Sequence, residues 1–390
     1  MAITGTNEKN TGRIRLGMVG GGRGAFIGAV HRLAARMDDQ YEFVAGALSS
    51  DPARSRASGK ELGLAPGRNY TDFTAMAKAE ASRADGIEVV SIVTPNHMHY
   101  PAAKAFVEAG IHVVCDKPLS LNLKEALALK KLLAKNPKVI FALTHNYSGY
   151  PMIRQAKAMV AAGELGEIRL VQGEYPQDWL TTDIEKSGQK QAAWRTDPKR
   201  SGAGGCVGDI GTHTYQLGCF VSGLKLNELS ADLTSFVKGR KLDDNAHVML
   251  RYRGGARGMI WASQVAPGHE NGLKLRVYGT RGGLEWVQAD PNYLWYTPFG
   301  EPKRLITRGG AGSNAAAARV TRVPPGHPEG YLEGFANIYT EVARAVKARR
   351  AGKRVEAAID FPGIADGVAG MAFIEACVKS SAKNGKWMKV

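Results

Sequence analysis

Residues 13–37, RIRLGMVGGGRGAFIGAVHRLAARM, decide the expected fold. A β-rich run over residues 13–19 leads into a cluster of glycines, and residues 25–37 then carry apolar side chains at helical spacing. Glycines between a strand and a helix permit a tight turn and let phosphate groups approach the amides that open the helix. A glycine cluster alone is more often an ordinary turn, but this position favours a phosphate-binding loop.

The glycine loop departs from the strict pattern G-x-G-x-x-G. Gly20 and Gly22 supply the first two glycines, but Ala25 stands at the third position and Gly28 comes three residues later. We therefore expect a lengthened loop that still lines a dinucleotide. Its expected cofactor contacts are Gly20, Gly22, Arg23, Gly24, Ala25, Phe26 and Ile27.

Strands and helices alternate through the rest of this region. Strand candidates at residues 41–48, 87–93, 111–115 and 139–144 are separated by helical patterns such as residues 52–62. The short, nearly continuous apolar runs suit strands that are buried on both faces. The pattern predicts an α/β domain with a parallel, doubly wound sheet, whose ligand lies beyond the carboxyl ends of the strands.

The second strand ends in serines, where NAD-binding proteins usually have an acidic residue for the ribose hydroxyls. Ser49 and Ser50 do not repel a 2′-phosphate, and Arg54 or Arg56 can pair with one, which slightly favours NADP on electrostatic grounds. Both arginines can equally be solvated helix charges. The expected cofactor is therefore NAD or NADP, with contacts from Ser49, Ser50 and Arg54.

Polar turns follow the next two strands. The segments VTPNHMH at residues 93–99 and CDKP at residues 115–118 fall at adjacent strand ends and define one crevice. His97 and His99 have a spacing that a metal site can use, but no cysteine or carboxylate set accompanies them, so we expect no metal. The expected cofactor contacts are Thr94, Pro95, Asn96, His99, Asp116, Lys117 and Pro118.

The pattern changes from residue 146 onward. Strand-like segments such as residues 247–252, 258–263 and 274–278 alternate with turns, which predicts an antiparallel sheet. Asp209 and His213 stand four residues apart on an expected helix, where they share one face. They form either a functional pair or a helix cap beside a packed histidine.

Length and charge bound the remaining possibilities. A chain of 390 residues exceeds a typical domain, and 44% hydrophobic with 23% charged residues is typical of globular proteins. We expect a flexible tail at residues 1–11, a dinucleotide-binding domain at 12–145 and a second domain at 146–390. The net charge of +16 is scattered along the chain, with no basic arm or zinc-finger spacing, so no nucleic-acid partner is expected.

Cysteine usage and hydropathy indicate the compartment. The four cysteines form no CxxC pair, which is typical of reduced thiols in a cytoplasmic protein. The first eleven residues are polar, and no later stretch approaches the roughly 18 apolar residues that span a membrane. We expect a cytoplasmic chain with no membrane partner.

Taken together, these motifs resemble the Gfo/Idh/MocA family of sugar and inositol oxidoreductases. Asp116-Lys117-Pro118 corresponds to the family's Glu-Lys-Pro signature. Residues 264–273 and 327–331 further resemble members similar to levoglucosan dehydrogenase. The other motifs that carry the resemblance are the glycine loop, Thr94-Pro95-Asn96-His97, Trp194-Arg195, Gly204-Gly205 and Asp209 with His213.

The resemblance implies a Rossmann domain followed by an α+β domain with an open-faced, mainly antiparallel sheet. That second domain binds substrate and commonly supports homodimers or homotetramers. The implied catalytic residues are Lys117, Asp209 and His213. The implied substrate-binding residues are Lys117, Asn146, Tyr147, Trp179, Arg195, Asp209 and His213.

The expected reaction is hydride transfer between a secondary hydroxyl of a sugar, inositol or glycoside and the nicotinamide of NAD(P). His213, with an ordinary pKa of about 6.5, is the first choice of general base. Lys117 then stabilises the alkoxide, although Lys117 is itself an alternative base. An NAD-dependent glycosidase that works by transient oxidation and elimination begins with the same residues. A noncatalytic NAD(P)-binding sensor is a third, weaker alternative.

Overall fold

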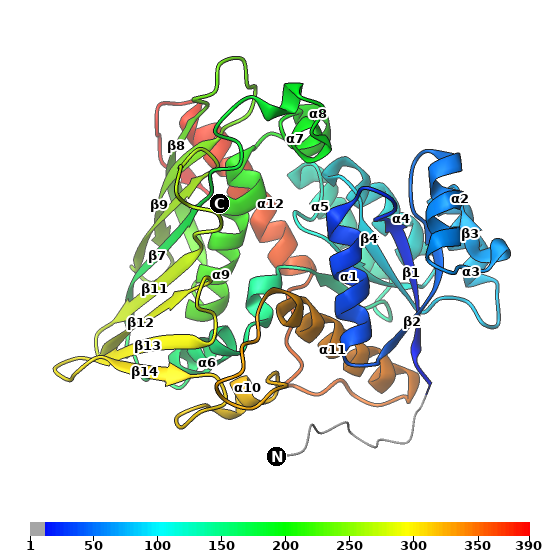
Figure 1. Cartoon of the computed structure of the whole chain (residues 1–390). Helices are drawn as coiled ribbons and strands as arrows, with labels where there is room; N and C mark the ends of the chain where they lie inside the picture. The colour runs from blue at the N-terminus through cyan, green and yellow to red at the C-terminus, as the bar shows by residue number, and fades with distance from the viewer. Residues whose placement is uncertain (1–11) are drawn as a thin grey trace. The chain divides into compact units, whose positions relative to one another are not determined.

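The computed structural model describes residues 12–390, so the expected flexible tail at residues 1–11 lies outside the described residues. The chain divides into two compact units. The first contains the chain up to Gly149 together with Tyr331–Val368, and the second contains Tyr150–Gly330 and Ala369–Val390 (Figure 1). A single division at residue 146 does not describe these units, because residues 331–368 return to the first.

The first unit is built on a six-stranded parallel sheet with the order β3-β2-β1-β4-β5-β6. This confirms the predicted Rossmann-type doubly wound sheet. The strand order reverses between β1 and β4, which is where such folds bind their ligands. Its elements are β1 (Ile14–Gly20), α1 (Phe26–Met37), β2 (Tyr41–Ala47), α2 (Pro52–Glu61), β3 (Asn69–Tyr70), α3 (Phe73–Ala81), β4 (Val89–Val93), α4 (His99–Glu108), β5 (His112–Cys115), α5 (Leu123–Lys135), β6 (Phe141–Leu143) and α11 (Tyr331–Arg350).

Helix α11 completes the core of the first unit and packs along α1. Its buried apolar residues recur at helical spacing, as in Phe335, Ile338 and Val342. The hydroxyl of Tyr339 lies 2.8 Å from Nδ1 of His31. These contacts explain why a segment distant in sequence belongs to this unit.

The second unit contains a nine-stranded sheet with the order β14-β13-β12-β11-β7-β10-β9-β8-β15. Its pairs are antiparallel except β7 with β10, so the prediction of a mainly antiparallel sheet is confirmed. Helix α12 (Ile364–Ser381) begins in the first unit and ends in the second. The other elements are α6 (Pro151–Ala161), β7 (Ile168–Pro176), α7 (Lys190–Arg195), α8 (Pro198–Ser201), α9 (Thr212–Ser222), β8 (Leu226–Thr234), β9 (Asn245–Tyr252), β10 (Arg257–Ser263), β11 (Lys274–Gly279), β12 (Gly282–Val287), β13 (Tyr293–Pro298), β14 (Arg304–Thr307), α10 (Ala315–Ala318) and β15 (Met388–Lys389).

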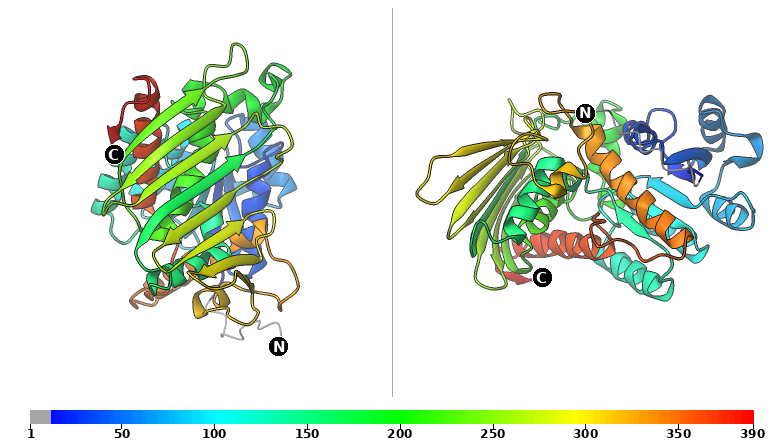
Figure 2. Two further views of the ribbon diagram at one scale, coloured as in Figure 1. Left: turned by 90° about the vertical axis from the view of Figure 1, so that its left-hand side faces the viewer. Right: turned by 90° about the horizontal axis from the view of Figure 1, so that it is seen from below.

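The two faces of this sheet differ. Helices α6 and α9 pack against one face, where Val248 and Ile260 are buried. On the other face, the cross-strand neighbours Met249 and Met259 are 55% and 46% exposed. Figure 2 (left) shows this face uncovered by helices. This face therefore carries a pair of neighbouring exposed methionines.

Two further findings concern the described residues as a whole. None of their helices combines the length and apolar character needed to cross a membrane. All four cysteines are free thiols, and Cys115, Cys206 and Cys377 are buried.

Candidate active site

The glycine loop connects β1 to α1. Gly20 and Gly24 have positive φ angles of 81° and 73°, which side chains other than glycine rarely adopt. Gly28 packs so closely that a Cβ atom on it would lie 2.3 Å from Cα of Gly21. Gly28 thus provides the close strand–helix approach of a third glycine, after a lengthened loop. Helix α1 begins without a side-chain cap at Ala25, so its first amides keep their capacity to bind an anion.

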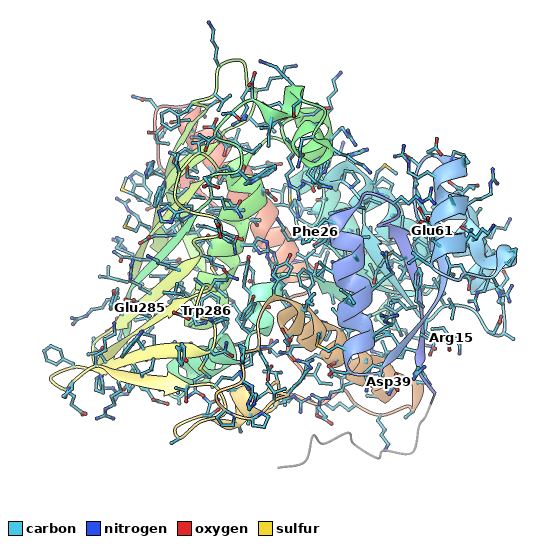
Figure 3. The ribbon with its side chains drawn as sticks, in the orientation of Figure 1. Arg15, Phe26, Asp39, Glu61, Glu285 and Trp286 are labelled. Carbon is cyan, nitrogen blue, oxygen red and sulfur yellow. The ribbon has the colours of Figure 1, made fainter. Side chains whose placement is uncertain are left out.

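Arg23 extends from this loop and forms hydrogen bonds with residues of α2. Its amide donates to Oγ of Ser58 at 3.0 Å, and its Nε donates to Oε2 of Glu61 at 2.7 Å. Figure 3 labels Glu61 on α2 and Phe26 at the start of α1, where the Phe26 side chain is 65% exposed. The predicted cofactor contact Arg23 therefore has a charge partner within the protein.

The end of β2 carries the predicted ribose contacts. The hydroxyl of Ser49 accepts from the amide of Asp51 at 3.2 Å, and Ser50 is exposed. Asp51 accepts from the amide of Arg54 at 2.6 Å and so caps α2. The Arg54 side chain is exposed. Asp51, the acidic residue closest in sequence to Ser49 and Ser50, therefore serves as the cap of α2.

His99 joins the turns that follow β4 and β5. It is buried, with Nδ1 at 2.6 Å from the carbonyl oxygen of Pro118 and Nε2 at 2.8 Å from that of Thr94. Burial lowers the pKa of His99, while Asp116 and the two carbonyl oxygens act in the opposite direction. Because both ring nitrogens face backbone oxygens, His99 positions these turns instead of offering a free polar atom to a cofactor.

The turn carrying Lys117 is also tied to the end of β6. Oδ1 of Asp116 accepts from the Lys117 amide at 3.0 Å and from Oγ1 of Thr144 at 2.8 Å. The next residue, His145, is buried, and burial with the charge of Lys117 lowers its pKa to about 3. The sequence prediction missed His145, although it follows a strand end as the other site residues do.

Asn146 and Tyr147 lie in a buried 3-10 turn, Asn146–Gly149, of the first unit. Among the described residues, Nδ2 of Asn146 and Oγ1 of Thr94 are buried without a hydrogen-bond partner. Buried polar atoms normally have partners. These two groups, the uncapped start of α1 and the glycine loop all occur at the carboxyl ends of the strands. They fit a polar dinucleotide such as NAD(P).

Asp209 and His213, the predicted pair of the second unit, lie where a π-helical turn continues into an α-helix. Asp209 belongs to a π-helical turn, Val207–Gly211, and His213 to the first turn of α9. Such π turns often mark functional sites. Oδ2 of Asp209 accepts from Nε2 of Gln264 at 2.9 Å and lies 3.3 Å from Nε of Arg195. The carboxylate is therefore held in place on two sides.

Asp243 fixes the start of this helical segment. Its carboxylate accepts from the amides of Gly205 and Val207 at 2.6 and 2.7 Å. A Cβ atom on Gly205 would lie 2.2 Å from the Asp243 carbonyl oxygen, so only glycine fits there. This explains the Gly204-Gly205 motif ahead of Asp209.

Polar and aromatic groups extend from this pair. The Arg195 guanidinium lies 4.3 Å from the ring of Trp194 and 5.9 Å from that of Trp179. The Trp179 indole donates to Gln177 at 3.1 Å, and Gln177 donates to Asn271 at 2.8 Å. The second unit thus brings Trp179 and Arg195 into one network with Asp209. The sequence prediction did not name Gln177, Gln264 or Asn271 as site residues, although Gln264 and Asn271 lie within residues 264–273, which it noted only for their resemblance.

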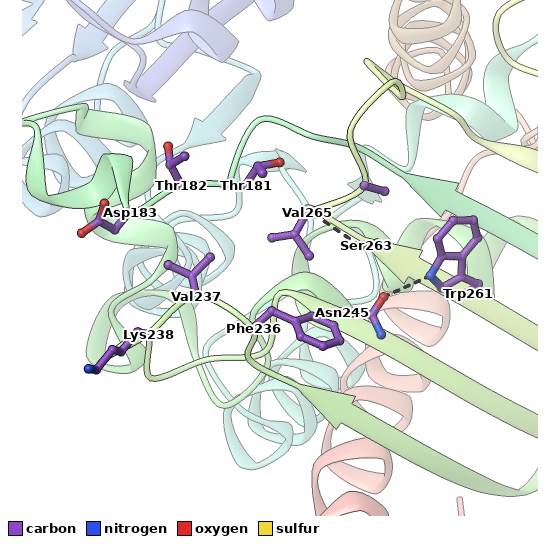
Figure 4. A pocket seen from close by; sticks show the side chains of 11 residues that line it. Thr181, Thr182, Asp183, Phe236, Val237, Lys238, Asn245, Trp261, Ser263 and Val265 are labelled. Atoms are coloured by element: carbon purple, nitrogen blue, oxygen red, sulfur yellow. Dashed lines mark hydrogen bonds between the residues drawn. The ribbon is translucent and has the colours of Figure 1, made fainter.

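The second unit also contains a cavity of about 830 Å³, at the ends of β9 and β10 (Figure 4). Arg240 stabilises its walls, because its guanidinium binds Glu185, Asp244 and the carbonyl oxygen of Thr182. None of the predicted site residues lines this cavity. Its lining residues are Thr181, Thr182, Asp183, Phe236, Val237, Lys238, Asn245, Trp261, Ser263, Val265 and Ala266.

Comparison of the sequence with known protein families identifies the family of this chain. Residues 14–145 match the oxidoreductase family with an NAD-binding Rossmann fold, and residues 153–285 match the GFO/IDH/MocA C-terminal domain. The chain belongs to the Gfo/Idh/MocA family. The suspected resemblance is confirmed, and the first unit is the NAD-binding Rossmann fold of this oxidoreductase family.

Three relatives of this Gfo/Idh/MocA protein are informative. An oxidoreductase from Sinorhizobium meliloti is 60% identical, with a TM-score of 0.88 over 97% of this chain and 100% of that one. An inositol dehydrogenase homolog from Azotobacter vinelandii, solved with NADH and myo-inositol, is 38% identical, with a TM-score of 0.91 over 97% and 98%. The levoglucosan dehydrogenase of Pseudarthrobacter phenanthrenivorans is 27% identical over 70% of this chain and 73% of that protein.

Proposed function

We propose that this protein is an NAD(P)-dependent dehydrogenase that oxidises a secondary hydroxyl of a neutral sugar, inositol or glycoside. The observation that carries the proposal is the pair formed by Asp209 and His213, one helical turn apart, in a chain whose other unit is an NAD-binding Rossmann fold. Gln264 and Arg195 hold the Asp209 carboxylate. A fixed carboxylate beside an imidazole suits hydroxyl recognition and proton removal.

The proposed chemistry divides between cofactor and protein. When bound, NAD(P) accepts the hydride of the carbinol carbon. His213 removes the hydroxyl proton, Lys117 donates a hydrogen bond to the oxygen that becomes a carbonyl, and Asp209 accepts from a neighbouring hydroxyl.

The ion pair between Arg195 and Asp209 supports a neutral substrate. The positive charge of Arg195 lies beside the negative charge of Asp209, so the pair leaves no net charge to select an acidic substrate. Gln177 and Asn271 add amides that suit hydroxyl groups, and Trp179 adds an aromatic face for a sugar ring. The Azotobacter relative solved with myo-inositol supports the same substrate class.

We propose that the cofactor contacts are the glycine loop, the end of β2 and the turns after β4 and β5. Within this set, the uncapped start of α1 holds the pyrophosphate, and the buried Thr94 hydroxyl and Asn146 amide offer polar partners. His99 supports this set by holding the turns after β4 and β5 together.

A substrate panel tests this function. Purified protein is incubated with inositols, aldoses, anhydro sugars and glycosides, each with NAD and with NADP, and absorbance of the reduced cofactor is followed. We expect reduction with at least one neutral polyol or sugar and no reaction with acidic analogues. Failure with every neutral substrate and both cofactors would overturn the proposal.

We also propose that the protein is a cytoplasmic homodimer or homotetramer. The exposed methionines Met249 and Met259 lie side by side on the helix-free sheet face, and exposed apolar patches of this kind mark interaction sites. The buried free thiols suit a reducing compartment. Light scattering should give two or four times the 41.8 kDa chain mass, whereas a monomer would contradict this expectation.

A further inference from the structure

The ion pair between Arg23 and Glu61 lies beside the end of β2, where a Rossmann fold binds the adenosine ribose. We propose that this pair limits the affinity for NADP: Glu61 withholds Arg23 from the 2′-phosphate, so NADP binds more weakly than it would to a free Arg23. The inference rests on the proposed function, because it requires that the first unit of this chain binds a dinucleotide.

The backbone brings Arg23 to this position. The amide of Gly22 donates to the carbonyl oxygen of Leu48, the first residue after β2, at 3.1 Å. A Cβ atom on Gly22 would lie 2.7 Å from both that oxygen and Oγ of Ser58, so the loop is pressed against β2 and α2. The Arg23 amide is bound to the same Ser58 hydroxyl at 3.0 Å. The backbone of Arg23 is therefore fixed beside the end of β2, the strand end that is expected to bind the adenosine ribose.

Glu61 binds the guanidinium of Arg23 through both of its carboxylate oxygens. Nε of Arg23 donates to Oε2 at 2.7 Å, and its Nη2 donates to the other carboxylate oxygen. This two-pronged geometry is the one that a phosphate group would otherwise receive from arginine. The two side chains are 57% and 49% exposed, so an entering phosphate can reach the pair.

The other polar and charged groups near the end of β2 act on a 2′-phosphate in the same way whether or not Glu61 is present. Ser49 and Ser50 are neutral, and the carboxylate of Asp51 caps α2 through the Arg54 amide. Asp51 is exposed and keeps its charge while it caps α2, so its repulsion of a 2′-phosphate is the same with and without Glu61. Arg54 is exposed and makes no ion pair among residues 12–390, so it attracts a phosphate whether or not Glu61 is present. Only the availability of Arg23 depends on Glu61.

The expected discrimination is modest. Exposed ion pairs shift an equilibrium by only a few-fold. We therefore expect Glu61→Gln to tighten NADPH binding about three- to fivefold while leaving NADH binding unchanged. Dissociation constants come from the fluorescence of NADH and NADPH titrated with the full chain in the absence of any sugar, so the readout does not depend on catalysis.

Three further samples complete the test. Wild-type protein supplies the reference ratio of NADH to NADPH affinity. The double variant Arg23→Ala with Glu61→Gln should lose the gain, because the released guanidinium is gone. The matched control is Glu108→Gln on α4, which removes an exposed carboxylate from the pair with Lys104 and should leave both affinities unchanged.

The outcomes separate the two proposals. Binding of neither dinucleotide by wild type would overturn the proposed function itself. If dinucleotides bind, then an unchanged ratio in Glu61→Gln, or a gain that persists in the double variant, would each overturn the role of the ion pair alone.

Discussion

Replacing Lys117 or His213 by alanine is expected to lower turnover by about 10²- to 10⁴-fold, the range that a positioned acid or base contributes. Lys117 lies in the turn held by Asp116, and His213 in the first turn of α9. Turnover is measured with the best substrate of the panel, and NADH binding is measured by fluorescence. Binding should survive both substitutions, because the glycine loop, the start of α1 and the backbone of the turn after β5 are unchanged.

Matched substitutions separate catalysis from folding. Lys104→Ala removes an exposed lysine from α4, and His247→Ala removes an exposed histidine from β9, so both should keep wild-type turnover. Added imidazole should restore part of the activity of His213→Ala if His213 removes the proton. Wild-type rates in either Lys117→Ala or His213→Ala would contradict the proposed mechanism.

Acidification is expected to destabilise the protein through buried histidines of the first unit. Burial lowers the pKa of His31 to about 4, against an unfolded value near 6.5. The unfolded chain therefore binds more protons between these values, and stability is lost as pH falls from about 6.5 toward 4. Between pH 7 and pH 4.5 this amounts to about 2 kcal/mol for His31 alone. His145, with a pKa of about 3, acts in the same direction.

One carboxylate opposes this trend. Burial raises the pKa of Asp243 to about 6 despite its two amide donors, so its contribution falls as pH rises through that value. The lowered pKa values of His31 and His145 together outweigh the raised pKa of Asp243, so we still expect the free energy of unfolding to fall on acidification.

The acid prediction is checked by urea unfolding midpoints at pH 7.0, 6.0, 5.0 and 4.5. His31→Gln keeps a hydrogen-bonding partner for Tyr339 and should show a shallower pH dependence, whatever its stability at pH 7. His247→Ala, on the exposed side of β9, should keep the wild-type slope. A midpoint that does not change with pH, or equal slopes in wild type and His31→Gln, would contradict the expectation.

Local patterns were sufficient to predict most of the fold. The glycine loop after β1 and the polar turns after β4 and β5 each stand next to an apolar run, and parallel strands bring their carboxyl ends to one edge. The spacing of Asp209 and His213 likewise predicts a shared helical face. Such inferences depend only on residues close together in sequence.

Features that depend on distant contacts could not be predicted in this way. Helix α11 belongs to the first unit through the packing of Phe335 and Tyr339 against α1, which no local pattern reveals. Gln264 reaches Asp209 from 55 positions away. His99 has the sequence context of a cofactor contact, but its two backbone partners give it a positioning role.

The most direct test of the central claim is the fate of one hydrogen. The best neutral substrate from the panel is prepared with deuterium on the oxidised carbon, and the reduced cofactor and the product are analysed by mass spectrometry. The proposed function predicts one deuterium in each reduced cofactor and an equal amount of ketone product. Release of an aglycone without net reduced cofactor, or reduced cofactor without deuterium, would contradict it.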